Sequence, residues 1–140
     1  VQFELAPHGD THILKSVDDI QGLLDDHIIK TQTMLGSPYV KAIDLQVKQW
    51  EGKLLRMQGI LDEWLKCQGV WHYLDPIFSS ADIQNSMPAE AQKFTMVNTM
   101  WHTVMEGTQK NPYVLARTAE DRMLVNFIEA NKLLEAILKQ

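Results

Sequence analysis

The side chains able to perform chemistry are sparse in this chain, and the closest group of them lies near its beginning. His8, Asp10 and His12 share an expected hairpin turn and offer three ligands to one divalent ion. Zinc sites usually present four ligands at characteristic spacings, and no fourth ligand follows at such a spacing here. We therefore interpret the three as solvated turn residues and keep a metal site as the weaker alternative.

Three further histidines fall on separate expected helices, without an HExxH spacing: His27, His72 and His102. We interpret each as a surface or packed histidine. The single cysteine, Cys67, stands beside Lys66 without a flanking histidine, and a thiol within a helix is usually an inert, small apolar group. One cysteine cannot form an intrachain disulfide, which favours a reducing, cytosolic compartment.

The adjacent acidic pairs Asp18/Asp19 and Asp25/Asp26 are the candidates for acid–base catalysis. Neighbouring residues diverge around a helix, so neither pair can converge on one substrate bond, and helix capping with a solvated face explains them better. The motifs GxxxxGK[ST], GxGxxG and GxSxG are absent from the sequence. These residues are accordingly expected to include no catalytic, cofactor-binding or metal-binding group.

Charge and composition exclude other classes of partner. The chain carries 13 basic and 18 acidic residues, a net charge of −5, and its Lys and Arg are scattered, so we expect no nucleic acid partner. No apolar run approaches the roughly 18 residues needed to cross a bilayer, so we expect no membrane partner. The sequence lacks an initiator Met and its apolar pattern still runs at Leu138, which we interpret as a fragment truncated at both ends.

Residues 1–15 have strand character, and residues 16–140 are expected to form a helical bundle. The runs QFEL and THILK flank the turn formers Pro7, Gly9 and Asp10, which predicts a β-hairpin. Ser16 is the predicted N-cap of a first helix. The apolar face of that helix is Ile20, Leu24, Ile28 and Thr31, and its predicted stop is Gly36, Ser37 and Pro38.

From Val40 onward, apolar residues recur at alternating steps of three and four, interrupted once by Gln68. This heptad pattern predicts one helix of about 35 residues, roughly 50 Å long, that ends at Pro76. A ligand box around its tryptophans would need convergent polar groups, and none is evident. We interpret the face as a packing seam against neighbouring helices, formed by Trp50, Leu54, Met57, Leu61, Trp64, Trp71, Tyr73 and Phe78.

Two more helices are predicted after a short turn capped by Ser79, Ser80 and Asp82. The first starts near Pro88, runs as far as Gly107 on the face Phe94, Val97, Trp101 and Val104, and is closed by Asn111 and Pro112. Thr118 and Asp121 resemble a capping box for the second, whose face is Met123, Phe127, Ala130, Leu134 and Ile137. The predicted fold is mainly α, an elongated bundle of about four helices with one very long helix and a short N-terminal β-hairpin.

Several stretches together give the chain a specific likeness. The pair Trp50–Glu51 stands early in the long helix, the block WHYLDPIF follows at Trp71, and then come the dipeptide DI and a helix start at Pro88 and Glu90. With the run DDIQGLLDDHIIKTQTMLGSPYVKAI, these features resemble the linker region of dynein heavy chains, N-terminal to the AAA+ ring. The likeness covers nearly the whole chain. HIIKTQTM, SPYVK and DPIFSS are more similar to axonemal inner-arm chains than to cytoplasmic ones.

The resemblance implies a mechanical function. In dyneins the linker arches over the AAA+ ring and bends and straightens as the ring hydrolyses ATP, which moves the motor along a microtubule. It also implies contacts with the ring and the remaining linker helices, with ATP, Mg, light and intermediate chains and microtubules bound by other regions of the parent chain. The implied location is the cytoplasm, the cytoskeleton and the axoneme of a cilium or flagellum. A net charge of −5 opposes direct binding to the acidic microtubule surface.

A helical lever bends where its hydrogen-bond ladder is weakened. Six positions are predicted as bend points: Gly36, Pro38, Gly59, Gly69, Pro76 and Pro112. Glycines inside the long helix mark either close helix contacts or points of compliance. Two alternatives stay open. One is a free-standing helical adaptor or cytoskeletal interaction module whose tryptophans grip a partner helix, and the other is a bundle enzyme that binds a metal through its histidines.

Overall fold

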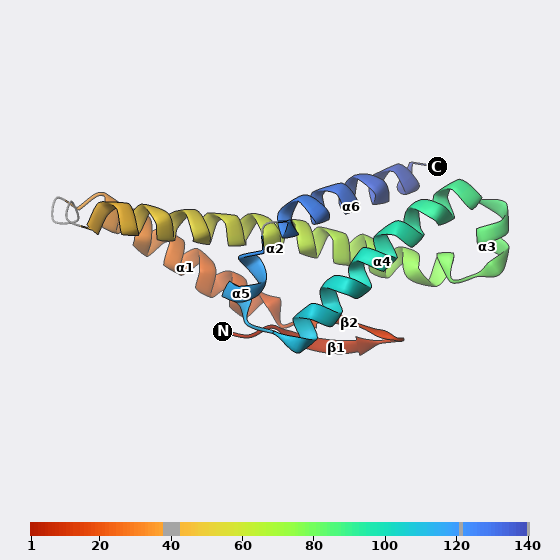
Figure 1. Ribbon diagram of the computed structural model, residues 1–140, viewed down its shortest axis with the longest axis horizontal. Coiled ribbons are helices and arrows are strands. Elements are labelled where there is room, and N and C mark those ends of the chain that lie inside the picture. Colours follow the sequence, from red (N-terminus) through yellow and green to blue (C-terminus); the bar gives the residue numbers. More distant parts are fainter. Residues whose placement is uncertain (38–42, 121, 140) are drawn as a thin grey trace.

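A single long helix organises this protein. The computed structural model describes residues 1–37, 43–120 and 122–139, and within them α2 (Asp44–Phe78) contacts every other helix. Figure 1 shows α2 along the whole length of an elongated molecule, with α1 beside one half and α6 beside the other. The remaining elements are β1 (Glu4–His8), β2 (Thr11–Lys15), α1 (Val17–Leu35), α3 (Ala81–Ser86), α4 (Pro88–Lys110), α5 (Val114–Thr118) and α6 (Met123–Leu138).

The predicted β-hairpin is confirmed. β1 and β2 pair in antiparallel register from Glu4 opposite Lys15 to His8 opposite Thr11, and Gly9 adopts the positive φ of 59° that the tight turn requires. The hairpin is attached to α2 by Gln68, whose side-chain amide accepts from the Leu14 N–H at 2.9 Å and donates to the Leu14 carbonyl at 3.1 Å. The polar interruption of the heptad pattern therefore satisfies the outer edge of β2.

The first helix lies where it was predicted, but its start has a different cause. All four residues of the predicted face are buried against α2. Ser16 occupies the predicted N-cap position, but its backbone is left-handed, with φ 55°, and its side chain makes no capping bond. The serine instead turns the chain sharply out of β2. The helix ends at Leu35, next to the predicted stop at Gly36, whereas Pro38 and Val40 lie outside the described residues.

The long helix continues through Pro76 to Phe78, so the predicted end at Pro76 is wrong. Proline removes one backbone N–H and its bond to the preceding turn. The last turn persists because Phe78 is buried and because both the N–H and the hydroxyl of Ser79 donate to the Asp75 carbonyl, at 3.0 and 2.7 Å. Packing and a local cap together offset the missing bond.

The described residues form six helices where about four were predicted. The additional ones are short: α3 occupies the predicted turn after α2, and α5 has no sequence-level prediction. Thr118 belongs to α5, and its hydroxyl donates back to the Val114 carbonyl at 2.8 Å, so the predicted capping box is wrong at this residue. Its partner Asp121 lies outside the described residues. The predicted apolar faces of the α4 and α6 segments are buried throughout.

The predicted close of α4 at Asn111 is confirmed, because the helix runs to Lys110 with Asn111 as its C-cap, and Gly107 inside the helix has a different role. The guanidinium of Arg117 is buried beside it, with Nη2 only 2.9 Å from the place of a Cβ on Gly107. Arg117 donates to the Thr108 hydroxyl at 3.2 Å, the Val104 carbonyl at 3.3 Å and the Glu120 carboxylate at 2.6 Å. A buried charge needs such partners, and only glycine leaves room for it at this point of α4.

The different surroundings of Gly69 and Gly107 yield a matched pair of predictions. A Cβ on Gly69 would meet nothing within 4 Å, so Gly69→Ala should raise the free energy of unfolding by about 0.5–1 kcal/mol through helix propensity. Gly107→Ala must displace the Arg117 guanidinium, and each lost bond to a charged group costs about 1.5–3 kcal/mol, so this variant should be destabilised by about 1 kcal/mol or more. Urea unfolding of the chain measures both. Equal shifts in the two variants would contradict the assigned role of Gly107.

Candidate functional site

The central feature of the long helix is a row of stacked aromatic rings. Trp64, Trp71 and Phe78 follow one another at seven-residue steps, and all three are buried. Trp64 stacks on Phe127 of α6, with ring centroids 5.0 Å apart and planes inclined by 24°. The other pairs are Trp71 with Trp101 at 5.1 Å and 20°, and Phe78 with Phe94 at 5.2 Å and 16°. We call these six residues the aromatic ladder.

The ladder fixes the register of α4 against α2. Phe94 and Trp101 on α4 are seven residues apart, as are Trp71 and Phe78 on α2. Because the two helices are antiparallel, Trp71 meets Trp101 and Phe78 meets Phe94. The Trp71 indole N–H donates to the side-chain oxygen of Asn98 at 3.0 Å. Asn98 lies on α4, one turn before Trp101. A slip of α4 by one turn would break both stacked pairs and this bond together. The aromatic ladder thus fixes α2 against α4 and α6, and its stacked rings leave no room for a ligand between them.

The residues of the predicted seam separate into two groups. Leu54, Met57 and Leu61 are buried together with the α2 members of the ladder. Tyr73 is 63% exposed, so its predicted packing is wrong, because a residue two positions after Trp71 points away from α4. Trp50 is 37% exposed, because it lies near the end of α2 that neither α4 nor α6 reaches.

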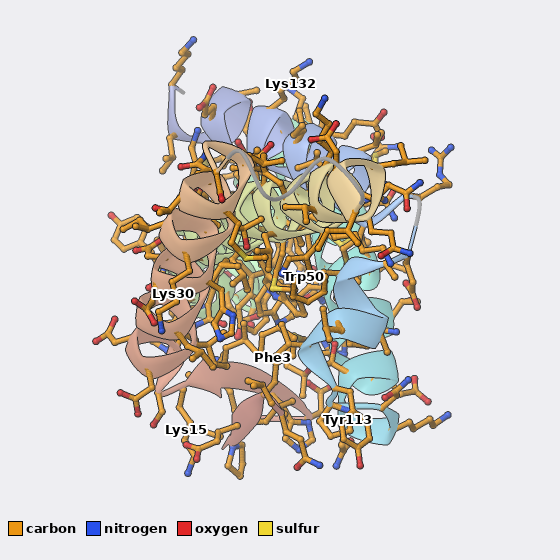
Figure 2. The ribbon with its side chains drawn as sticks, turned by 90° about the vertical axis from the view of Figure 1, so that its left-hand side faces the viewer. Phe3, Lys15, Lys30, Trp50, Tyr113 and Lys132 are labelled. Atoms are coloured by element: carbon orange, nitrogen blue, oxygen red, sulfur yellow. The ribbon has the colours of Figure 1, made fainter. Side chains whose placement is uncertain are left out.

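An apolar groove opens at that end of the molecule. A hollow of about 250 Å³ lies between α1, α2 and α5, and its walls are almost entirely apolar. Figure 2 views the molecule from this end and shows Trp50 between α1 and α5, above Phe3. A second hollow of about 320 Å³ shares Trp50, Met57 and Leu115 with the first. We call the joined hollows the apolar groove, lined by Val1, Ile20, Leu23, Leu24, His27, Trp50, Lys53, Leu54, Arg56, Met57, Tyr113, Val114, Leu115, Thr118 and Ala119.

One wall of the groove depends on the N-terminal residues. The N–H of Val114 donates to the Val1 carbonyl at 3.1 Å, and the N–H of Phe3 donates to the Pro112 carbonyl at 2.7 Å. Gln2 forms a β-bridge with Tyr113 between them. Phe3 is buried, with its ring 5.0 Å from that of Trp64. The first three residues thus hold α5 in place and connect the groove to the aromatic ladder.

The groove has one charged edge, and it is basic. Lys53 and Arg56 line it from α2, and Lys53 is exposed. Arg56 donates from Nη2 to the Glu120 carbonyl at 2.7 Å, whereas its buried Nε has no acceptor among the described residues. An unpaired buried donor costs free energy, and because this atom is buried, no group outside the chain reaches it in this arrangement.

The sequence-predicted chemical residues do not assemble into a catalytic site. The Asp75 carboxylate accepts a hydrogen bond from His8 Nε2 at 3.2 Å, and the His8 ring lies 5.3 Å from that of Trp71, so these contacts attach the hairpin to α2. The His102 Nε2 atom lies 3.9 Å from the Asp10 Oδ1 atom. In the described ranges, no three His, Cys, Asp or Glu side chains gather closely enough to hold a metal ion. None of the helices in the described part of the chain combines the length and apolar character needed to cross a membrane.

The titratable groups with shifted pKa values also have structural explanations. Burial raises the pKa of the Cys67 thiol to about 12, with a smaller contribution from the charge of Glu63. The hydrogen bond between Lys66 and Glu135, 2.9 Å long, raises the pKa of the lysine and lowers that of the carboxyl. This exposed pair joins α2 to α6 and is worth little in water. Because its pKa is raised and its side chain is buried, the Cys67 thiol is protonated and shielded from solvent at neutral pH.

The predicted bend points have different surroundings. Gly69 lies in the middle of α2 with open space around it, and Gly59 has only a side-chain atom of Leu124 at 4.0 Å, so close helix contact does not explain either glycine. Pro76 is exposed within the last turn of α2. Pro112 joins α4 to α5 and accepts the bond from Phe3. Whether the chain bends at these residues stays a prediction.

The ladder predicts a contrast between two aromatic residues of α2. Trp71→Ala leaves a cavity beside Trp101 and should lower the free energy of unfolding by about 3–5 kcal/mol. The matched control Tyr73→Ala removes an exposed ring and should change it by less than about 0.5 kcal/mol. Chemical denaturation monitored by circular dichroism measures both. A cost for Tyr73→Ala as large as that for Trp71→Ala would contradict the assignment of the ladder.

The buried thiol supplies a second prediction from this region. Because alkylation requires the thiolate, Cys67 should not react with iodoacetamide in the folded chain at pH 8, and should react within minutes once urea unfolds it. Mass spectrometry of the modified chain measures the extent of alkylation. Rapid alkylation under native conditions would contradict the packing of α2 around this residue.

Comparison with known proteins agrees with the likeness expected from the residues. The family model described as dynein heavy chain, N-terminal region 2, matches residues 1–140. Dynein axonemal heavy chain 3 of Homo sapiens is 52% identical over 130 residues, which is 93% of this chain and 3% of the relative. Dynein axonemal heavy chain 12 of Homo sapiens is 46% identical over 141 residues, or 99% of this chain and 5% of the relative. Dynein axonemal heavy chain 1 of Mus musculus is 40% identical over 141 residues, again 99% of this chain and 3% of the relative.

The chain therefore spans only 3–5% of the length of these relatives, while nearly all of it is matched by each of them. The match includes the long helix with its aromatic ladder, the hairpin and the residues of the apolar groove, because the family model extends from the first residue to the last. This chain belongs to the dynein heavy chain family, as part of its N-terminal region.

Proposed function

We propose that this chain is a segment of the dynein linker, a mechanical element that transmits force between the ATP-hydrolysing ring of the heavy chain and the rest of the motor. The observation that supports the proposal best is the aromatic ladder. Three stacked pairs tie the second half of α2 to α4 and α6, so a load applied at one end of this half is carried by several elements at once. Such bracing suits a lever, because a load cannot shift α4 along α2 without breaking two stacked pairs.

The proposal assigns motion to the ends of the segment. The ladder and its flanking bonds resist bending between Trp64 and Phe78, whereas one proline-containing turn, at Pro76, lies at the edge of that braced part. Gly59 lies before it on α2, and a Cβ there would meet only a side-chain atom of Leu124 of α6, 4.0 Å away. A lever of this kind would move as a stiff body between compliant positions.

Nucleotide chemistry and track binding belong, in this proposal, to other regions of the heavy chain. ATP and Mg would bind in the AAA+ ring, and microtubules and the smaller chains would bind elsewhere. The axonemal names of the relatives support a place in the axoneme of a cilium or flagellum. The adaptor alternative would instead require this segment to act without a nucleotide-hydrolysing ring.

Distance measurements in the full-length heavy chain test the lever. Fluorophores are attached through a non-natural amino acid at Asn85, an exposed position at the α3 end, and on the ring, and energy transfer is measured with ATP and with ADP. A lever predicts a change in transfer between the two nucleotides. A second, short-range pair at Asp62 and Tyr73, two exposed positions that lie between Gly59 and Pro76, is the control and should not change, because this part of α2 is braced.

The two pairs separate the possible failures. An unchanged distance to the ring would contradict the lever. A nucleotide-dependent change within the segment itself would contradict stiffness while leaving the motion of the linker intact.

A further inference from the structure

The last turn of α2 is completed by one exposed serine side chain. Pro76 removes a backbone N–H from this turn. The Ser79 hydroxyl donates to the Asp75 carbonyl at 2.7 Å, and the Ser79 N–H donates to the same carbonyl at 3.0 Å. Because Ser79 is exposed to solvent, the hydroxyl that caps the proline-containing turn is open to covalent modification.

The segment after Ser79 can open without disrupting the core. A protein kinase binds its substrate residue in an extended segment, which a folded domain supplies only where local unfolding costs little free energy. Helix α3 has six residues, and none of them is buried. Figure 1 shows α3 at one tip of the elongated molecule, directly after the end of α2. Ser79 therefore lies where a kinase could reach it while the interior of the bundle stays packed.

An acidic residue three positions further along gives Ser79 the charge pattern of a kinase substrate. Kinases that select acidic sites pair a carboxylate near the serine with basic side chains of their own, so the charge pattern decides which serine is used. Asp82 is exposed and stands three residues after Ser79. The neighbouring Ser80 and Ser86 have apolar residues at that distance.

Three other hydroxyl residues have an acid at the same distance, but the fold makes each of them less accessible. Thr118 is buried, and Thr103 lies inside α4, the helix that carries part of the aromatic ladder. Ser16 stands directly before the buried Val17, at the junction of β2 and α1. Among the described residues, Ser79 is the one that combines exposure, the acidic pattern and a neighbouring segment without buried side chains.

We propose that Ser79 is phosphorylated by a protein kinase that selects acidic sites, and that the phosphate releases the last turn of α2. The Ser79 Oγ attacks the γ-phosphorus of ATP, so the Oγ–P bond forms while the bond from that phosphorus to the β–γ bridging oxygen breaks. The hydroxyl proton passes to a base of the kinase, and ADP leaves. The inference uses the fold of the described residues and does not rest on the proposed lever.

The phosphate acts on α2 in two ways. It replaces the hydroxyl proton, so the bond from the Ser79 side chain to the Asp75 carbonyl is lost. It also adds negative charge at the C-terminal end of a helix, where the macrodipole is already negative and where the last turn has no basic residue to compensate. The turn that contains Pro76 then opens and loosens the stacked pair of Phe78 and Phe94.

Phosphorylation of the folded, full-length heavy chain tests the site. The chain is incubated with ATP and an active kinase that prefers an acid three residues after its serine, and mass spectrometry measures the occupancy of each serine. We expect occupancy at Ser79 about tenfold above that at Ser80 or Ser86, and about fivefold lower in Asp82→Asn. Modification of Ser79 only after unfolding, or equal occupancy in Asp82→Asn, would overturn the proposed recognition. The Ser79 peptide of heavy chain isolated from its own cells should also carry phosphate, and its recovery without any would overturn the proposal.

Hydrogen exchange of the full-length chain measures the effect on α2. Phosphoserine is incorporated in place of Ser79 or, as a matched control, of Ser86, whose hydroxyl donates to the Asp82 carbonyl at 2.6 Å within α3. We expect the amides of residues 77–80 to exchange about tenfold faster with phosphate at Ser79, and within about twofold of the unmodified chain with phosphate at Ser86. Ser79→Ala, which removes the hydroxyl without adding charge, should give an intermediate rate. Unchanged exchange with phosphate at Ser79, or an equal increase in the control, would overturn the release of the last turn.

Discussion

Stacking between the indole rings of Trp71 and Trp101 is the contact on which the arrangement of this protein depends. Both side chains are completely or almost completely buried, and their planes lie 20° apart, so the rings contact each other over a large area. The pair on one side joins α2 to α6 and the pair on the other side joins it again to α4. Because the two pairs on α4 share one seven-residue spacing, any shift of α4 along α2 disturbs both of them. Rigidity here follows from register and not from the number of apolar residues.

Polar residues complete the interior at the places where backbone groups would otherwise lack partners. Gln68 satisfies the edge of β2, and the Asn131 amide donates to the Glu63 carbonyl at 2.9 Å and to its carboxylate. Arg117 connects α4 to α5 from inside the core. Each of these groups costs free energy to bury and regains it only in one geometry. The polar contacts therefore make the packing of α2, α5 and α6 specific, whereas the burial of apolar side chains supplies most of its free energy.

The sequence predicted what periodicity can report and missed what depends on distant partners. The buried faces of the α1, α4 and α6 segments followed from spacing, because a helix buries the residues that share one side. The end of α2 did not, since the cost of Pro76 is offset by the burial of Phe78 and by Ser79, and neither effect is visible as a local propensity. Helix α5 was missed because it is five residues long and is positioned by pairing with residues 1–3. The aromatic spacing indicated a seam, but the identity of each partner required the fold.

The same spacing explains why the two ends of α2 differ. Trp50 continues the seven-residue series of Trp64 and Trp71, so it occupies the corresponding angular position on the helix, yet no ring of α4 or α6 lies opposite it. Within the described residues, its surroundings are the walls of the apolar groove. Trp50 is 37% exposed, whereas Trp64 and Trp71 are almost completely buried, and the missing partner accounts for the difference. The braced part of α2 therefore ends where its ring partners on α4 and α6 end, although the seven-residue spacing continues to Trp50.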